Sequence, residues 1–192
     1  MCIRDSQGII RNRVISSSKY SIIEYVDINI YYSGLGMWHG GNPYLIPKDG
    51  NSNQIASLCS LDKILTDLSL LSVLQNINSI TVILDIKYIN HSEMVDGYRY
   101  PNLSEKICIL AASSTGESSL ENDEMKHSVF SYFLFKGLKG DAMGSDNKIE
   151  LGELAEYLYR KVPEASKKED NSMQQNPEFI GSDLKRILLD LR

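Results

Sequence analysis

Small and polar residues follow two apolar stretches of the sequence, and their positions are those at which an α/β protein carries out its chemistry. The first stretch, Asp27 to Ser33, leads into Gly34, Leu35 and Gly36, and the second, Ile80 to Ile86, contains Asp85 and is followed by Lys87. Short runs rich in Ile, Val and Tyr are typical of strands buried on both faces. In open α/β sheets, sites lie beyond the carboxyl ends of the strands. We therefore expect a site at residues 33–36 and 85–90.

Ser33 and Lys87 suggest one chemistry, in which a lysine takes the proton of a serine nucleophile. That role needs a neutral amine, and therefore an apolar or cation-rich environment. Asp85 lies two residues before Lys87, on the same face of a continuing strand. A nearby carboxylate favours the charged amine, so we expect a Lys87–Asp85 ion pair instead.

Four segments resemble motifs of one family. Tyr31-Tyr-Ser-Gly-Leu-Gly36 resembles the Tyr-Tyr-Ser-Gly-His-Gly motif of caspases and metacaspases, and Ile83-Leu-Asp-Ile-Lys87 resembles their Leu-Asp-Ala-Cys motif. Tyr44-Leu-Ile-Pro-Lys-Asp49 is similar to a segment of bacterial caspase-like proteins, and Gln174-Gln-Asn-Pro177 resembles the Gln-x-Pro that often closes these domains. The resemblance covers nearly all of residues 27–177. It implies an α/β, caspase-like three-layer fold, with a mostly parallel central sheet flanked by helices.

The same resemblance implies that the catalytic pair is missing. In the family the His is the general base and the Cys is the nucleophile, and here the matching positions hold Leu35 and Lys87. Leucine cannot accept a proton from a thiol. Ser33, Gly34, Gly36 and Asp85 remain as substrate-pocket or oxyanion candidates, since the Asp matching Asp85 helps metacaspases form a pocket for a basic side chain. His39 is a weak alternative base, and we interpret Trp38-His-Gly-Gly41 as a surface turn.

These residues lead to three hypotheses about function. The first is a regulatory pseudoprotease, which binds a peptide or a protein such as an active caspase-like relative and is able to dimerise through an edge strand. The second is an active caspase-type cysteine endopeptidase with non-standard catalytic residues, so the sequence leaves open whether the chain is an enzyme. The third is a truncated gene fragment without a selected function, which sequencing the DNA upstream of residue 7 would test.

The composition is that of an ordinary soluble protein. Apolar residues make up 42%, charged residues 23%, and the formal net charge is −5, which argues against a nucleic-acid partner. No apolar run approaches the ~18–20 residues of a membrane helix. Three cysteines without paired spacing favour a reduced, cytoplasmic protein. We expect no metal or other cofactor, because the segment from Asp141 fails the calcium-loop pattern at four positions; calcium is implied by family analogy only.

Met1-Cys-Ile-Arg-Asp-Ser6 resembles the translation of a sequencing adaptor found in metagenomic gene models. We exclude residues 1–6 as an adaptor-derived artefact and interpret residues 7–192 as a single caspase-like domain, with an N-terminal strand and helix of the family missing. Within it the patterns predict a broken helix over Gln7 to Ile23, a helix after an N-cap at Ser60, a strand over 106–112, helices over 124–138 and 150–161, and a strand or short helix in 179–191.

Overall fold

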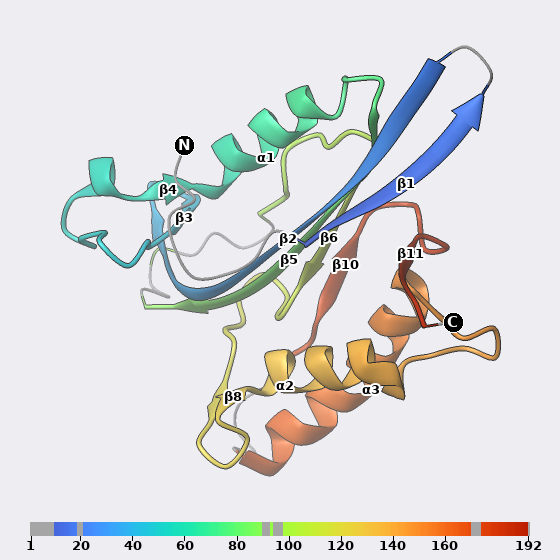
Figure 1. The fold of residues 1–192 in the computed structure, drawn as a ribbon. Coiled ribbons are helices and arrows are strands. Elements are labelled where there is room, and N and C mark those ends of the chain that lie inside the picture. Colours follow the sequence, from blue (N-terminus) through green and yellow to red (C-terminus); the bar gives the residue numbers. More distant parts are fainter. Residues whose placement is uncertain (1–9, 19–20, 90–92, 94–97, 170–173, 192) are drawn as a thin grey trace.

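A mixed sheet forms the centre of the fold (Figure 1). The computed structural model describes residues 10–18, 21–89, 93, 98–169 and 174–191. In these residues a seven-stranded sheet has the order β10-β6-β5-β2-β3-β4, with β1 also pairing with β2. Its strands are β1 (Ile10–Ser18), β2 (Ser21–His39), β3 (Asn42–Leu45), β4 (Cys59–Ser60), β5 (Ile77–Tyr88), β6 (Ile107–Ala111) and β10 (Glu178–Ile180). The three central strands β2, β5 and β6 run parallel, and the strands that flank them pair antiparallel.

The N-terminal segment differs from the prediction. Residues 10–18 form strand β1, which pairs antiparallel with residues 21–29 of β2, so the expected broken helix is wrong. Its β-branched residues are Ile10, Val14 and Ile15, and such residues favour a strand when a partner strand is present. Strand β2 also continues beyond Ser33, where we expected it to end, because Gly34 to Gly36 pair with β5 and Gly36 to His39 pair with β3.

Helix α1 (Leu61–Leu71) covers one face of the sheet. The predicted N-cap is confirmed, since the Ser60 hydroxyl accepts a hydrogen bond from the backbone N–H of Lys63. Leu61 and Leu65 are almost completely buried and pack with one alternate set of strand residues, which includes Ile80, Val82, Leu84, Ile86, Ile107 and Ile109. The short helix η1 (Ile55–Ser57) precedes β4.

Helices α2 (Val129–Lys136) and α3 (Leu151–Glu169) cover the other face, which completes the three layers (Figure 1). Their apolar residues pack with the opposite set of strand residues, including Ile83, Cys108 and Leu110. The hairpin β7 (Glu121–Asn122) and β8 (His127–Ser128) leads into α2, and the segment η2 (Gly137–Asp141) follows it. The α/β fold with helices on both faces of a central sheet is therefore confirmed.

The C-terminal segment is fixed to the sheet by a buried arginine. Strand β11 (Ile187–Asp190) pairs with β9 (Lys148–Glu150), and Arg186 directly precedes it. The Arg186 guanidinium donates to the carbonyl oxygen of Ile80 at 2.8 Å, to the hydroxyl of Thr81 at 3.1 Å and to the carbonyl oxygen of Lys106 at 3.0 Å. It thereby joins the amino ends of β5 and β6, at the opposite end of the sheet from the candidate site.

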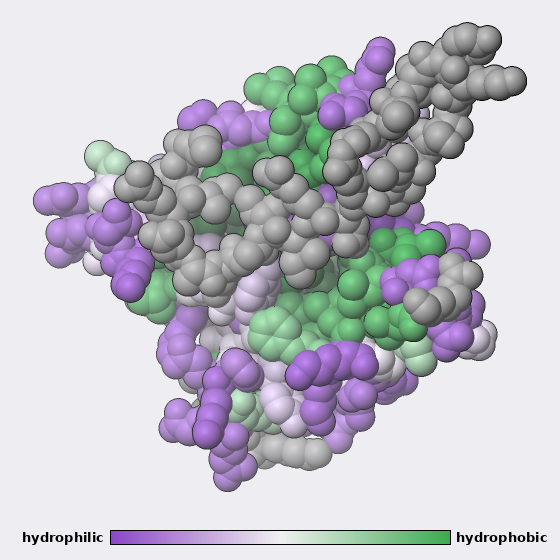
Figure 2. Space-filling view, viewed as in Figure 1, coloured by the Kyte–Doolittle hydropathy of each residue, from purple (hydrophilic) through white to green (hydrophobic). Residues whose placement is uncertain are grey.

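Apolar side chains are exposed at the C-terminal end of α1, where Leu70, Val73 and Leu74 are 68%, 78% and 52% exposed. Figure 2 shows a hydrophobic area over this end of the helix. None of the helices in the described residues is long and apolar enough to cross a membrane.

Candidate functional site

The two predicted strand ends lie side by side. Strands β2 and β5 pair in parallel, with Ser33 opposite Asp85 and Leu35 opposite Lys87. Neighbouring strands of a sheet are ~4.8 Å apart, so the residues that we singled out from two distant parts of the sequence meet at one edge of the fold. Gly34 and Gly36 lie on the same stretch of β2.

Lys87 forms an ion pair with a residue that the sequence analysis did not identify. Its ammonium group donates to Glu121 Oε2 at 3.0 Å, and the two side chains are 46% and 67% exposed. The predicted Lys87–Asp85 ion pair is therefore wrong. Asp85 is on the same side of β5, but it is only 2% exposed and its oxygens accept hydrogen bonds from serine hydroxyls.

Three serine hydroxyls donate to the buried carboxylate of Asp85. Ser119 donates to Oδ1, while Ser128 and Ser131 donate to Oδ2. The fourth contact comes from Ser33, whose hydroxyl lies 3.4 Å from Oδ2. Ser128 is the N-cap of α2, and a helix N-terminus favours a nearby negative charge. The burial cost of the carboxylate is thus offset by hydrogen bonds that arrive from β2, the 113–122 loop and α2.

Tyr31 extends this hydrogen-bonded group. Its hydroxyl lies 2.6 Å from the Ser131 hydroxyl, and its ring contacts Phe135 edge-on at 5.8 Å between centroids. Burial raises the pKa of Tyr31, and the charge of Asp85 raises it further. The tyrosine therefore stays protonated at neutral pH and is able to donate a hydrogen bond.

The loop that carries Ser119 and leads to Glu121 is held by the 174–177 segment. Gln175 is fully buried; its amide nitrogen donates to the carbonyl oxygen of Ala112 at 2.9 Å, and its amide oxygen accepts from the Leu120 N–H at 3.1 Å. The neighbouring Asn176 donates both its backbone and its side-chain N–H to Glu117, each at 2.6 Å. The motif Gln174 to Pro177 thus fixes one wall of the site.

Glycine at position 36 is required by close packing. A Cβ atom there would lie 2.5 Å from Ile86 Cγ2 and 3.1 Å from the carbonyl oxygen of Tyr44. At Gly34 a Cβ atom would lie 2.9 Å from the hydroxyl oxygen of Tyr32. Both glycines therefore allow neighbouring strands and side chains to approach β2 closely.

His39 lies away from the paired strand ends. It is the last residue of β2, pairs with Asn42 in the β2–β3 hairpin, and its imidazole lies 3.7 Å from the Glu93 carboxylate. Its neighbour Trp38 is only 2% exposed, so the predicted surface turn is wrong at this residue. The turn itself comes later, at Gly40 and Gly41, which have positive φ.

A groove of about 560 Å³ lies beside Lys87 and is lined in part by Ser119, Glu121, Asp123 and Glu124. Three carboxylates against one ammonium make its lining acidic. In the described part of the chain, no three His, Cys, Asp or Glu side chains are grouped so as to hold a metal ion. The segment that follows Asp141 leads through a turn to β9 and α3.

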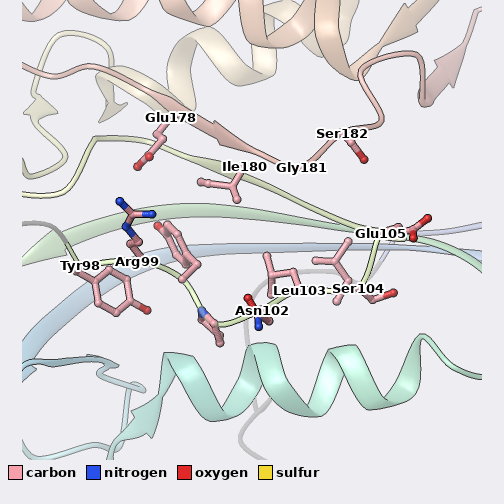
Figure 3. Close-up of a pocket in the computed structure, with 13 residues that line it drawn as sticks. Tyr98, Arg99, Asn102, Leu103, Ser104, Glu105, Glu178, Ile180, Gly181 and Ser182 are labelled. Carbon is pink, nitrogen blue, oxygen red and sulfur yellow. The ribbon is translucent and has the colours of Figure 1, made fainter.

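A second hollow, of about 550 Å³, lies away from the strand ends, between residues 98–105 and β10. Figure 3 shows Arg99 on one wall and Glu178 on the other, with α1 beyond the 98–105 segment. Burial raises the pKa of the Glu178 carboxyl, as does the nearby charge of Glu117. Since neither Lys87 nor Asp85 lines this hollow, it is separate from the candidate site.

Sequence reasoning missed the partners of Asp85 and Lys87. Ser119, Ser128 and Ser131 are 34, 43 and 46 positions from Asp85 in the sequence, and Glu121 is 34 positions from Lys87. One signal was present, because a serine directly before the apolar run Val129-Phe130 is typical of a helix N-cap.

Comparisons with known proteins give a fold. No family model matches the sequence, and no curated protein matches it. Among solved structures, caspase-1 from Spodoptera frugiperda is similar, with a TM-score of 0.54 and 15% sequence identity over 84% of this chain. The match covers 61% of the caspase-1 chain, so this chain spans less than two thirds of that structure. The arrangement of sheet and helices described above is therefore that of a caspase-like fold.

Proposed function

We propose that this caspase-like domain binds a peptide or protein segment without hydrolysing it. The observation that carries the proposal is the pair of facing residues at the strand ends, since Leu35 and Lys87 supply neither a general base nor a thiol. The two cysteines in the described residues, Cys59 and Cys108, are 7% and 0% exposed. A thiol nucleophile must be accessible and ionised, so neither replaces the missing group.

An active peptidase with non-standard residues is the alternative function. It would need Lys87 as a base for Ser33, but the Lys87 side chain is paired with the Glu121 carboxylate at 3.0 Å. The Ser33 hydroxyl lies 3.4 Å from the Asp85 carboxylate. A carboxylate alone does not replace the oriented imidazole of a serine peptidase. The geometry thus supports binding better than turnover.

The acidic groove beside Lys87 favours a ligand with Lys or Arg side chains. Glu121, Asp123 and Glu124 lie on its walls, and opposite charges increase both association rate and selectivity. We expected Asp85 to contact a basic side chain directly, but serine hydroxyls enclose its carboxylate. In this proposal Asp85 instead holds the wall of the groove in place through its hydrogen bond with Ser119. A second caspase-like protein is a further candidate partner, because β10 ends the strand order and offers an edge for pairing.

Two measurements test this proposal. The parent protein and the Leu35→His/Lys87→Cys variant are incubated with fluorogenic peptides that carry Arg, Lys or Asp at the cleaved position. We expect no turnover by the parent, and turnover of the Arg or Lys peptides by the variant if the groove still orients them. Turnover by the parent that Lys87→Met abolishes would overturn the proposal.

Binding is measured separately, by fluorescence anisotropy with a labelled Arg-containing peptide. Glu121→Gln is expected to weaken binding, whereas Asp67→Asn, which removes an exposed carboxylate from a different ion pair on α1, is the matched control. Equal affinities for the Arg peptide and an Asp-containing peptide would contradict the assigned ligand class.

A further inference from the structure

A third hollow, of about 460 Å³, lies against α2 and η2. Its apolar wall is formed by Met125, Phe135 and Leu138, three partly buried side chains that pack against the main core. The Phe135 ring is fixed between two others, since its centroid lies 5.8 Å from that of Tyr31 and 5.7 Å from that of His127. The hollow thus has a preformed apolar side, of the kind that holds the body of a small organic ligand.

The remaining lining includes two lysines. His127, Lys136 and Lys139 border the hollow, together with Tyr132, and none of the lining residues is acidic. No ion pair within the described ranges joins these three side chains to a carboxylate. The charge of this lining is thus the reverse of that of the acidic groove beside Lys87.

Lys136 is held at the hollow by its neighbour. Its ammonium group lies 4.9 Å from the centre of the Tyr132 ring. A hydrogen bond with Tyr132 raises the pKa of this lysine, and the charge of Asp141 has a smaller effect in the same direction. The Asp141 carboxylate accepts a hydrogen bond from the Tyr157 hydroxyl at 3.2 Å, so it is already engaged on α3. Lys136 therefore presents a full positive charge beside the apolar wall at neutral pH.

We propose that this hollow binds an organic anion, meaning a phosphate or carboxylate attached to an aromatic or similarly compact apolar group. The apolar group packs on Phe135, Met125 and Leu138, and the anion lies between Lys136 and Lys139. The volume is within the range of ~300–1,000 Å³ typical of ligand pockets. This site is independent of the peptide-binding function proposed above, because the two hollows share no lining residue.

Isothermal titration calorimetry with phenyl phosphate, benzoate, inorganic phosphate and benzyl alcohol tests the proposal. Phenyl phosphate or benzoate should bind, and the better of the two identifies the anion. Inorganic phosphate lacks the apolar group and benzyl alcohol lacks the charge, so each should bind at least about tenfold more weakly. A parent protein that binds neither aromatic anion, or that binds inorganic phosphate equally well, would overturn the proposal.

Variants locate the site. Lys136→Gln and Lys139→Gln should each weaken binding of the aromatic anion about three- to fivefold, since partly exposed charges contribute modestly. Lys63→Gln removes a comparably exposed lysine from α1 and should leave the affinity unchanged. Both lysines of the hollow are exposed, so the variants are expected to fold, which circular dichroism checks. Equal affinity in all three variants would place the anion elsewhere.

Discussion

Replacing Arg186 should destabilise the fold strongly, although this residue is far from the candidate site. Its guanidinium makes three hydrogen bonds to the amino ends of β5 and β6, and its side chain is 6% exposed. Hydrogen bonds to a charged group contribute ~1.5–3 kcal/mol each. Arg186→Met loses these hydrogen bonds, but it also removes the energetic cost of burying the charged guanidinium, which offsets part of the loss. We therefore expect the free energy of unfolding to fall by about 2–4 kcal/mol.

Urea denaturation measures this effect. With a slope of ~2 kcal/mol per M, the midpoint should move down by roughly 1–2 M at constant slope. Arg160→Met makes the same change at an exposed position on α3 and should alter the free energy of unfolding by less than about 0.5 kcal/mol. Arg186→Lys keeps the charge but not the forked donor geometry, so it should be at least as destabilising as Arg186→Met. Equal midpoints for Arg186→Met and Arg160→Met would refute the reasoning.

Three further predictions concern the site wall, a buried phenol and the core. Gln175→Leu removes the two hydrogen bonds that hold the 113–122 loop and should lower the free energy of unfolding by about 2–3 kcal/mol. Gln174→Leu, at the exposed neighbouring position, should lower it little. The midpoints of urea denaturation compare the two variants. Burial raises the pKa of Tyr32 to about 12. The stability that its neutral form contributes is therefore complete below about pH 10 and is lost as the pH approaches 12. In an ultraviolet titration of Tyr32→Phe, the absorbance change of this late-titrating phenol should be missing. Leu65→Ala, at a fully buried position, should lower the free energy of unfolding by about 2–5 kcal/mol, measured by thermal or urea denaturation. An equal loss for Leu70→Ala, at an exposed position, would contradict the assignment of the buried face.

The sequence predicted the elements whose signals are local. Helix α1 follows from its serine N-cap and from apolar residues at helical spacing, and β5 follows from a short run rich in Ile, Val and Leu. Because β2 and β5 are parallel neighbours, their carboxyl ends meet as expected, and Leu35 and Lys87 face one another. The assignments of α1 and β5 needed no knowledge of the rest of the chain.

The errors concern pairings that a local pattern does not record, either with the neighbouring strand of a hairpin or with residues 34 to 46 positions away. Residues 10–18 form a strand because β2 is available for pairing. Lys87 contacts Glu121 because the hairpin of β7 and β8 passes the end of β5, and Asp85 is satisfied by serines brought there by α2 and the 113–122 loop. Helix α2 begins at Val129 rather than near residue 124, since residues before it form β7 and β8. Local propensity does not record which distant segments compete for the same residue.

The connection made by Arg186 also has a consequence for biosynthesis. Arg186 follows Ile80 by 106 positions, and a ribosome that adds ~5–20 residues per second needs on the order of 5–20 s to reach it. During that interval the nascent strands β5 and β6 are present without the cation that joins their amino ends. The emerging chain therefore depends for several seconds on its own partial collapse, or on a chaperone, to keep these two apolar strands from aggregating.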